Sequence, residues 1–174
     1  GMPEGVAAVA IPFEAGVTLT APDVMPVLEY GFRDSLDRFM AGWAGDAPVR
    51  SLAEVAALNA GDRANRAPYG DRFVAGSAKT TITAAEYAEM RRISQATARE
   101  AIRALLRAYN VDVLAGHVEQ SYAAAGFPAL AVPNGVDGAG QPVGVVFVVD
   151  DPNEPQLLAA GAAFERARDG RVLP

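Results

Sequence analysis

The chain has 174 residues, of which 51% are hydrophobic and 21% are charged, and its formal net charge is -6. This length and composition are typical of a folded globular domain and exclude an intrinsically disordered chain. The negative charge argues against a nucleic-acid partner, because binding to phosphates requires an excess of Lys and Arg.

The N-terminal part of the sequence predicts a strand and then a helix. Residues 6–11 form a short apolar run that ends at Pro12, a pattern typical of a buried strand. A helix is expected over about residues 22–43, since Pro22 and Asp23 suit the first turn of a helix.

A short helix is expected next, over about residues 51–59. Ser51 and Glu54 have the spacing of a capping box, which marks the start of a helix. The following residues 61–76 are rich in Gly, Arg and Asp, and we expect them to form a surface loop or short helical turns.

The longest helix is predicted over residues 84–109, where Thr83 and Glu86 form a second capping box. Apolar residues recur there at three- and four-residue spacing, which predicts a buried face. That face is expected to contain Tyr87, Met90, Ile93, Thr97, Ala101, Leu105 and Tyr109. The arginines lie mostly off this face and are expected to be solvated: Arg91, Arg92, Arg99, Arg103 and Arg107.

The last part of the chain predicts further strands and a closing helix. Near-continuous apolar runs predict strands at about residues 111–115, 128–132 and 142–149. An amphipathic helix is expected over about residues 153–168. The expected fold is therefore α/β, a single domain over residues 1–174. In it, a mixed sheet of a few strands (about 6–11, 111–115, 128–132 and 142–149) is covered by helices at about 22–43, 51–59, 84–109 and 153–168.

Several segments resemble motifs of one enzyme family, in that family's order. They are residues 49–59 (VRSLAEVAALN), 111–115 (VDVLA), 125–133 (AGFPALAVP), 140–144 (GQPVG) and 154–158 (EPQLL). Over roughly residues 20–174, the chain resembles the C-terminal portion of the amidase signature family, which hydrolyses carbon–nitrogen amide bonds. The resemblance implies the C-terminal part of the amidase-signature fold and no cofactor.

Catalysis in that family uses a Ser-Ser-Lys set carried by a Gly/Ser-rich segment, which this sequence lacks. Ser77 and Lys79 are the only place where serine and lysine meet, and no glycine run beside them could supply oxyanion-hole donors. We expect Lys79 to lie in a surface loop and the chain to contain no catalytic residue. As an amidohydrolase, it is predicted to be inactive alone.

The resemblance also implies candidates for substrate contact, which are His117, Glu119, Gln120 and Tyr122. His117 with Glu119 could instead form an acid/base pair of a different small enzyme, although a lone loop histidine is more often structural. No metal site is expected, since the chain has no cysteine and one histidine. Asp150, Asp151 and Glu154 also lack the ligand spacing of a calcium loop.

The beginning of the chain carries expectations of its own. Gly1 before Met2 is expected to be the remainder of a cleaved tag, so that the gene begins at Met2. The short length would then be natural, or would follow from a misplaced start or a frameshift. A separate N-terminal amidase chain could complete a split enzyme.

The alternative to a partial amidase is a non-catalytic self-associating or ligand-binding module derived from the same fold. A piece of the family's core would expose apolar surface, so a homo-oligomer is expected. No apolar run is long enough to span a membrane, and the start lacks the basic region of a signal peptide. A cytoplasmic location without membrane contact is therefore expected.

Overall fold

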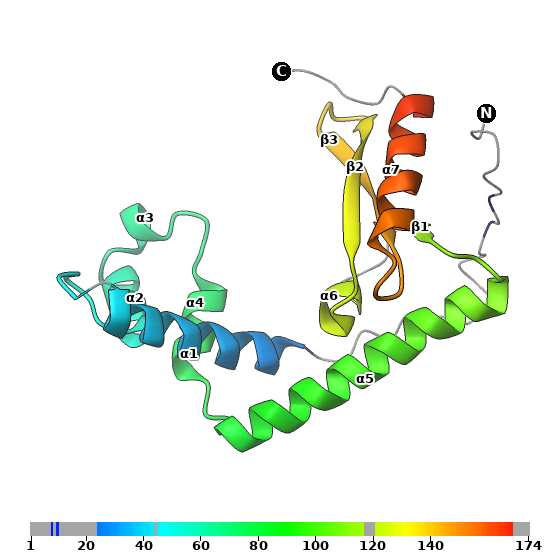
Figure 1. The fold of residues 1–174 in the computed structure, drawn as a ribbon. Coiled ribbons are helices and arrows are strands. Elements are labelled where there is room, and N and C mark those ends of the chain that lie inside the picture. Colours follow the sequence, from blue (N-terminus) through cyan, green and yellow to red (C-terminus); the bar gives the residue numbers. More distant parts are fainter. Residues whose placement is uncertain (1–7, 9, 11–23, 44, 117–120, 169–174) are drawn as a thin grey trace. The chain divides into compact units, whose positions relative to one another are not determined.

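The computed structural model describes residues 8, 10, 24–43, 45–116 and 121–168, so the predicted strand at 6–11 and Gly1 lie largely outside the described residues. The elements follow one another as α1 (Met25–Trp43), α2 (Leu52–Gly61), α3 (Arg63–Arg66), α4 (Arg72–Lys79), α5 (Ala84–Tyr109), β1 (Leu114–Gly116), α6 (Ser121–Ala125), β2 (Ala129–Val136), β3 (Pro142–Val148) and α7 (Glu154–Arg168), as Figure 1 shows. The α/β fold class is confirmed. Within the described residues, no helix has both the length and the apolar character needed to cross a membrane.

The chain divides into two compact units, one within residues 23–93 and the other within residues 94–174. Helix α5 is continuous and contributes residues to both units. Each unit is described by itself below.

The 23–93 unit is built from helices, and polar contacts define where α2 begins. Asp37 Oδ1 on α1 accepts a hydrogen bond from the Leu52 backbone N–H at 2.7 Å, so α2 starts against α1. The predicted capping box of α2 is present: Ser51 Oγ accepts from Glu54 N–H at 3.3 Å, and Glu54 Oε2 accepts from Arg50 N–H at 2.7 Å. These bonds place the Leu52 side chain in a fully buried position.

Residues 61–76, expected as loop or short turns, contain α3 and most of α4. Arg63 and the buried Asp71 form an ion pair with a 3.0 Å N–O distance, which ties α3 to the start of α4. A Cβ atom at Gly76 would lie 2.5 Å from Glu29 Oε1 on α1, so α4 packs close to α1 and the Glu29 side chain would have to move to admit a larger residue. Lys79 is consequently the last residue of a helix, and the expectation of a loop there is wrong.

The 94–174 unit contains an antiparallel three-stranded sheet of order β1-β3-β2. A short reversal at residues 137–141 joins β2 to β3, and a connection this short permits only antiparallel pairing. Asp137 Oδ1 stabilises the reversal by accepting hydrogen bonds from the N–H groups of Ala139 and Gln141, both at 2.9 Å. Helix α7 packs on β2 and β3.

Two hydrophobic clusters form the core of this unit. The first joins α5 to the sheet and consists of Ala98, Ile102, Leu105, Leu114, Ala125, Phe127 and Val148. The second lies under α7 and consists of Val132, Phe147, Val149 and Leu157. The close approach of α7 depends on Gly161, since a Cβ atom there would overlap the Leu130 side chain.

The long helix forms over the predicted residues, but part of its predicted buried face is wrong. Ile93 and Thr97 are exposed, and the buried residues of α5 are Ser94, Ala98, Ile102 and Leu105. These follow one another at three- and four-residue spacing, so they form a helical stripe of their own. The predicted face included the exposed Ile93 and Thr97 and omitted three of the four buried residues, which are Ser94, Ala98 and Ile102.

Candidate functional site

The predicted substrate contacts lie between β1 and β2. Strand β1 ends at Gly116, whose φ of +129° favours glycine. His117, Glu119 and Gln120 lie outside the described residues. Tyr122, in α6, is half-buried and packs against the first core cluster, a packing role. Contact of these four residues with substrate stays a prediction.

The only lysine and its neighbouring serine do not form a catalytic pair. Ser77 is fully buried in α4, and its Oγ has no hydrogen-bond partner among the described residues. Lys79 is exposed at the end of the same helix. Side chains two positions apart on a helix do not face each other, so Lys79 cannot take a proton from Ser77 in this arrangement.

One acidic residue shortly before α7, Asp150, is part of an ion pair. Arg103 donates from Nε to Asp150 Oδ2 at 2.7 Å and from Nη2 to Oδ1 at 2.9 Å. The hydrogen bond from Arg103 lowers the pKa of the Asp150 carboxyl from its ordinary value, against the effect of partial burial. No group of three or more possible metal ligands occurs in the described part of the chain. The role that the structure shows for Asp150 is its bidentate pair with Arg103, which links α5 to the segment between β3 and α7.

Two arginines of α5 that were expected on a solvated face contact residues at the end of α6 and between α6 and β2. Arg99 Nε donates to the Ala125 carbonyl oxygen at 2.8 Å, and the guanidinium carbon atoms of Arg99 and Arg103 lie 5.7 and 5.3 Å from the centre of the Phe127 ring. Arg99 and Arg103 are four residues apart, so both project from one side of α5. The expectation of a solvated face is wrong for these two residues.

The Arg103–Asp150 pair predicts a change in stability with pH. Because the pKa of Asp150 is lower in the folded chain, the pair stabilises the fold above the unfolded pKa of about 4 and is lost as the pH falls further. We expect Asp150→Asn to lower the midpoint of thermal unfolding at pH 7 and to reduce the difference between pH 7 and pH 3. Circular dichroism during heating measures both.

The neighbouring exposed carboxylate, Asp151, provides the matched control. Asp151→Asn removes the same charge without removing the bidentate pair, so its effect at pH 7 should be smaller. Equal losses in the two variants would show that the paired geometry contributes nothing beyond charge.

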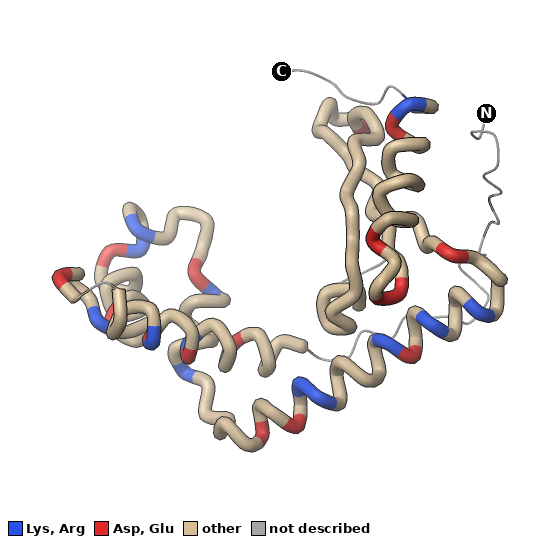
Figure 2. The backbone as a smooth tube through the Cα atoms, viewed as in Figure 1, with Lys and Arg blue, Asp and Glu red and all other residues tan. Residues whose placement is uncertain are grey.

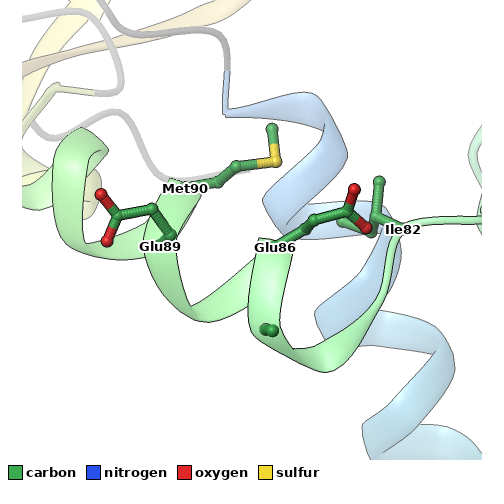
Figure 3. A pocket seen from close by; sticks show the side chains of 5 residues that line it. Ile82, Glu86, Glu89 and Met90 are labelled. Carbon is green, nitrogen blue, oxygen red and sulfur yellow. The ribbon is translucent and has the colours of Figure 1, made fainter.

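One surface hollow lies at the start of α5 and is lined by Ile82, Ala85, Glu86, Glu89 and Met90 (Figure 3). Glu86 Oε2 accepts from Thr83 N–H at 2.7 Å, and both Glu89 oxygens accept from Arg92 at 2.7 and 2.8 Å. These bonds lower the pKa of both carboxyls. Both side chains are thus ionised and already bonded, so this hollow lacks a pair of acid and base groups.

A second hollow, the β2–α7 groove, has a volume of about 250 Å³. Its lining residues are Leu130, Ala131, Val132, Pro133, Leu158, Gly161, Ala162 and Glu165. Glu165 is the one charged side chain among them. The groove therefore suits an apolar group, and it carries no set of residues for amide hydrolysis.

No protein-family model and no curated protein matches the chain. Solved structures do match it. One is an amidase family protein from Bacillus anthracis, which is 34% identical with a TM-score of 0.76. That match covers 89% of this chain and 31% of the Bacillus protein. The resemblance to amidases is confirmed.

Two structures of a peptide amidase also match. The native peptide amidase from Stenotrophomonas maltophilia is 28% identical with a TM-score of 0.69, over 86% of this chain and 34% of that protein. A peptide amidase in complex with the competitive inhibitor chymostatin is 27% identical with a TM-score of 0.71, with the same coverage of 86% and 34%. The chain thus has part of an amidase fold and spans about a third of the length of these amidases.

The sequence analysis assigned no role to the β2–α7 groove. The sequence does contain a sign of this apolar groove, because residues 121–136 include no charged side chain. The apolar pattern predicted a buried strand at 128–132, whereas Val132 is the one buried residue of β2 and Ala129 and Ala131 are exposed.

Proposed function

We propose that the chain is the C-terminal portion of an amidase-signature amidohydrolase and that it does not hydrolyse amides alone. The observation that carries this proposal is the unequal coverage: 89% of this chain matches only 31% of the amidase family protein. Hydrolysis of a carbon–nitrogen bond would then belong to a larger assembly that contains this portion.

The chemistry of amide hydrolysis supports the same proposal. It requires an activated nucleophile, a base and donors that stabilise the oxyanion. In the described residues, Ser77 is buried and Lys79 faces away from it, and the carboxylates of Glu86 and Glu89 are already bonded. The parts needed for the reaction are therefore expected outside this chain.

A direct assay tests the absence of activity. The purified chain is incubated with a small primary amide and with a peptide that ends in a carboxamide, and ammonia release is measured. We expect no release above the rate without protein. Release that disappears in Ser77→Ala or Lys79→Ala would overturn the proposal, because it would place nucleophile and base in this chain.

The alternative function is a non-catalytic module that associates with itself. Large exposed apolar side chains near the end of α1 favour it: the Trp43 side chain is 85% exposed and Phe39 is 54% exposed. Surfaces of this kind mark contacts with other proteins. The molar mass in solution discriminates the two, since this alternative requires an oligomer at micromolar concentration and a monodisperse monomer would contradict it.

A further inference from the structure

Helix α1 has a packed side and an exposed side within the 23–93 unit. On the packed side, Asp37 bonds to the start of α2, Met40 is buried, and Glu29 lies close to α4. The other side carries uncharged, exposed residues that recur at three-, four- and seven-residue spacing, so they form one helical stripe. This stripe, the α1 outer face, consists of Leu28, Ser35, Phe39, Gly42 and Trp43.

The 23–93 unit buries little apolar surface of its own. Among its described residues, the buried hydrophobic side chains are Met40 and Leu52, whereas both hydrophobic clusters consist of residues from the 94–174 unit. On the α1 outer face, by contrast, Leu28 is 45% exposed, Phe39 54% and Trp43 85%. A partner that covers this face would bury apolar surface that the unit alone leaves in water.

The charge of this unit permits contact with a second copy of itself. Residues 23–93 contain ten acidic and nine basic residues, a net charge of -1, so most of the chain's net charge of -6 lies elsewhere. Acidic and basic residues are interspersed along the helices of this unit, as Figure 2 shows. Two such units consequently repel each other little when they approach.

The order of side chains along the α1 outer face is self-complementary. The small Ser35 lies at its middle, where two antiparallel copies of α1 can approach closely. Leu28 precedes Ser35 by seven residues and Gly42 follows it by seven, about 10 Å on either side at 1.5 Å per residue. In an antiparallel pair, Leu28 of each copy would therefore lie opposite Gly42 of the other and beside its Phe39. The space is open there, since a Cβ atom at Gly42 would meet nothing within 4 Å.

A charged pair beside the α1 outer face fits the same arrangement. Asp34 and Arg38 form an ion pair one helical turn apart, with side chains that are 41% and 73% exposed. Antiparallel helices bring the same flank of each helix together. With the two copies aligned at Ser35, Arg38 of one lies about 3 Å along the axis from Asp34 of the other. Opposite charges would therefore meet at the rim of the contact.

We propose that the α1 outer face binds the α1 outer face of a second copy of this chain, antiparallel and about a twofold axis at Ser35. Such an interface uses the same patch on both sides, so it closes at two copies. The inference goes beyond the proposed function, because it assigns a surface and a partner and adds no catalytic group to either copy.

An introduced cysteine tests the axis, because the chain contains no cysteine of its own. Ser35→Cys places one thiol at the proposed axis, where the two Cα atoms should come within the roughly 4.4–6.8 Å that a disulfide spans. Mild oxidation at micromolar concentration should convert most of this variant to a covalent dimer on a denaturing gel. Ala41→Cys is the matched control, since Ala41 is exposed on α1 outside the α1 outer face, and it should stay mostly unlinked. Equal yields of covalent dimer would overturn the proposed contact.

Molar mass in solution, measured by sedimentation of the full chain, tests the apolar contact. The unmodified chain should be a dimer at micromolar concentration. Phe39→Arg should raise the dissociation constant about tenfold or more, because it places a charge in the centre of the contact. Tyr69→Arg is the matched control, since Tyr69 is a fully exposed aromatic residue of the same unit outside the α1 outer face, and its dissociation constant should not change. Circular dichroism verifies that both variants are folded.

The outcomes separate this inference from the proposed function. A monomeric unmodified chain, or a dimer that Phe39→Arg does not weaken, would overturn the inference. Replacement of the second copy by the unmatched portion of the Bacillus anthracis amidase family protein, with loss of the dimer, would also overturn it, because that portion would then be the occupant. Ammonia release is measured separately: a monomer without release sinks only the inference, and a dimer that releases ammonia sinks only the proposed function.

Discussion

Ile102→Ala is expected to lower the free energy of unfolding of the 94–174 unit by about 2–5 kcal/mol, the usual range for an isoleucine truncated in a core. Ile102 is fully buried on α5 and belongs to the cluster that includes Phe127 and Val148. Truncation removes its side-chain contacts and leaves a cavity between the helix and the sheet. Urea unfolding followed by circular dichroism measures the loss.

Ile93→Ala is the matched control, because Ile93 is on the same helix and is 49% exposed. Its substitution should change the free energy of unfolding by no more than about 0.5–1 kcal/mol. The comparison also tests which face of α5 is buried. If Ile93→Ala lowered the free energy of unfolding more than Ile102→Ala, the buried face of α5 would be the one that the apolar pattern predicted.

Leu52→Ala should destabilise the 23–93 unit by a similar amount, about 2–5 kcal/mol. The Leu52 side chain is fully buried at the start of α2, while its backbone N–H bonds to Asp37. Alanine keeps that N–H, so the loss would report the side chain alone. Hydrogen exchange of the α2 amides under native conditions measures it without assuming that both units unfold together.

Leu58→Ala controls for this substitution, since Leu58 lies on the same helix and is 42% exposed. We expect it to accelerate exchange in α2 far less than Leu52→Ala does. If the two variants accelerated exchange equally, the packing of α2 against α1 described here would be wrong.

Local signals in the sequence predicted the elements well. The capping boxes at Ser51 and Thr83 were confirmed, and each marks the helix start that it predicted. Apart from α6, which was not predicted, the strands and helices of the 94–174 unit lie close to their predicted positions, because prolines and glycines end the apolar runs there. These features depend on residues that are neighbours in the sequence.

Features that depend on distant residues were not predicted. Arg103 and Asp150 are 47 positions apart, and nothing in the pattern pairs them. Helix α4 lies in a Gly- and Arg-rich stretch, and its contacts are with residues distant in sequence: Asp71 pairs with Arg63, and Gly76 lies close to Glu29. The strand order β1-β3-β2 of the described residues is likewise not determined by an apolar run alone.

The candidate site was less predictable than the fold. Three of its four residues precede α6 in a segment outside the described residues, and Tyr122 packs against the core. Their roles came from the family resemblance, which concerns a larger fold than this chain contains. The resemblance itself was confirmed by the solved amidase structures that match the chain. It rested on several motifs in order, which carry more information than any single residue.

The central claim is that amide hydrolysis requires amidase parts outside this chain. The measurement that tests it most directly is ammonia release from a peptide carboxamide by the chain alone, by the unmatched portion of the Bacillus anthracis amidase family protein alone, and by the two together at equal concentration. We predict release only from the two together. Release by the chain alone, or a mixture no faster than the added portion alone, would contradict the account.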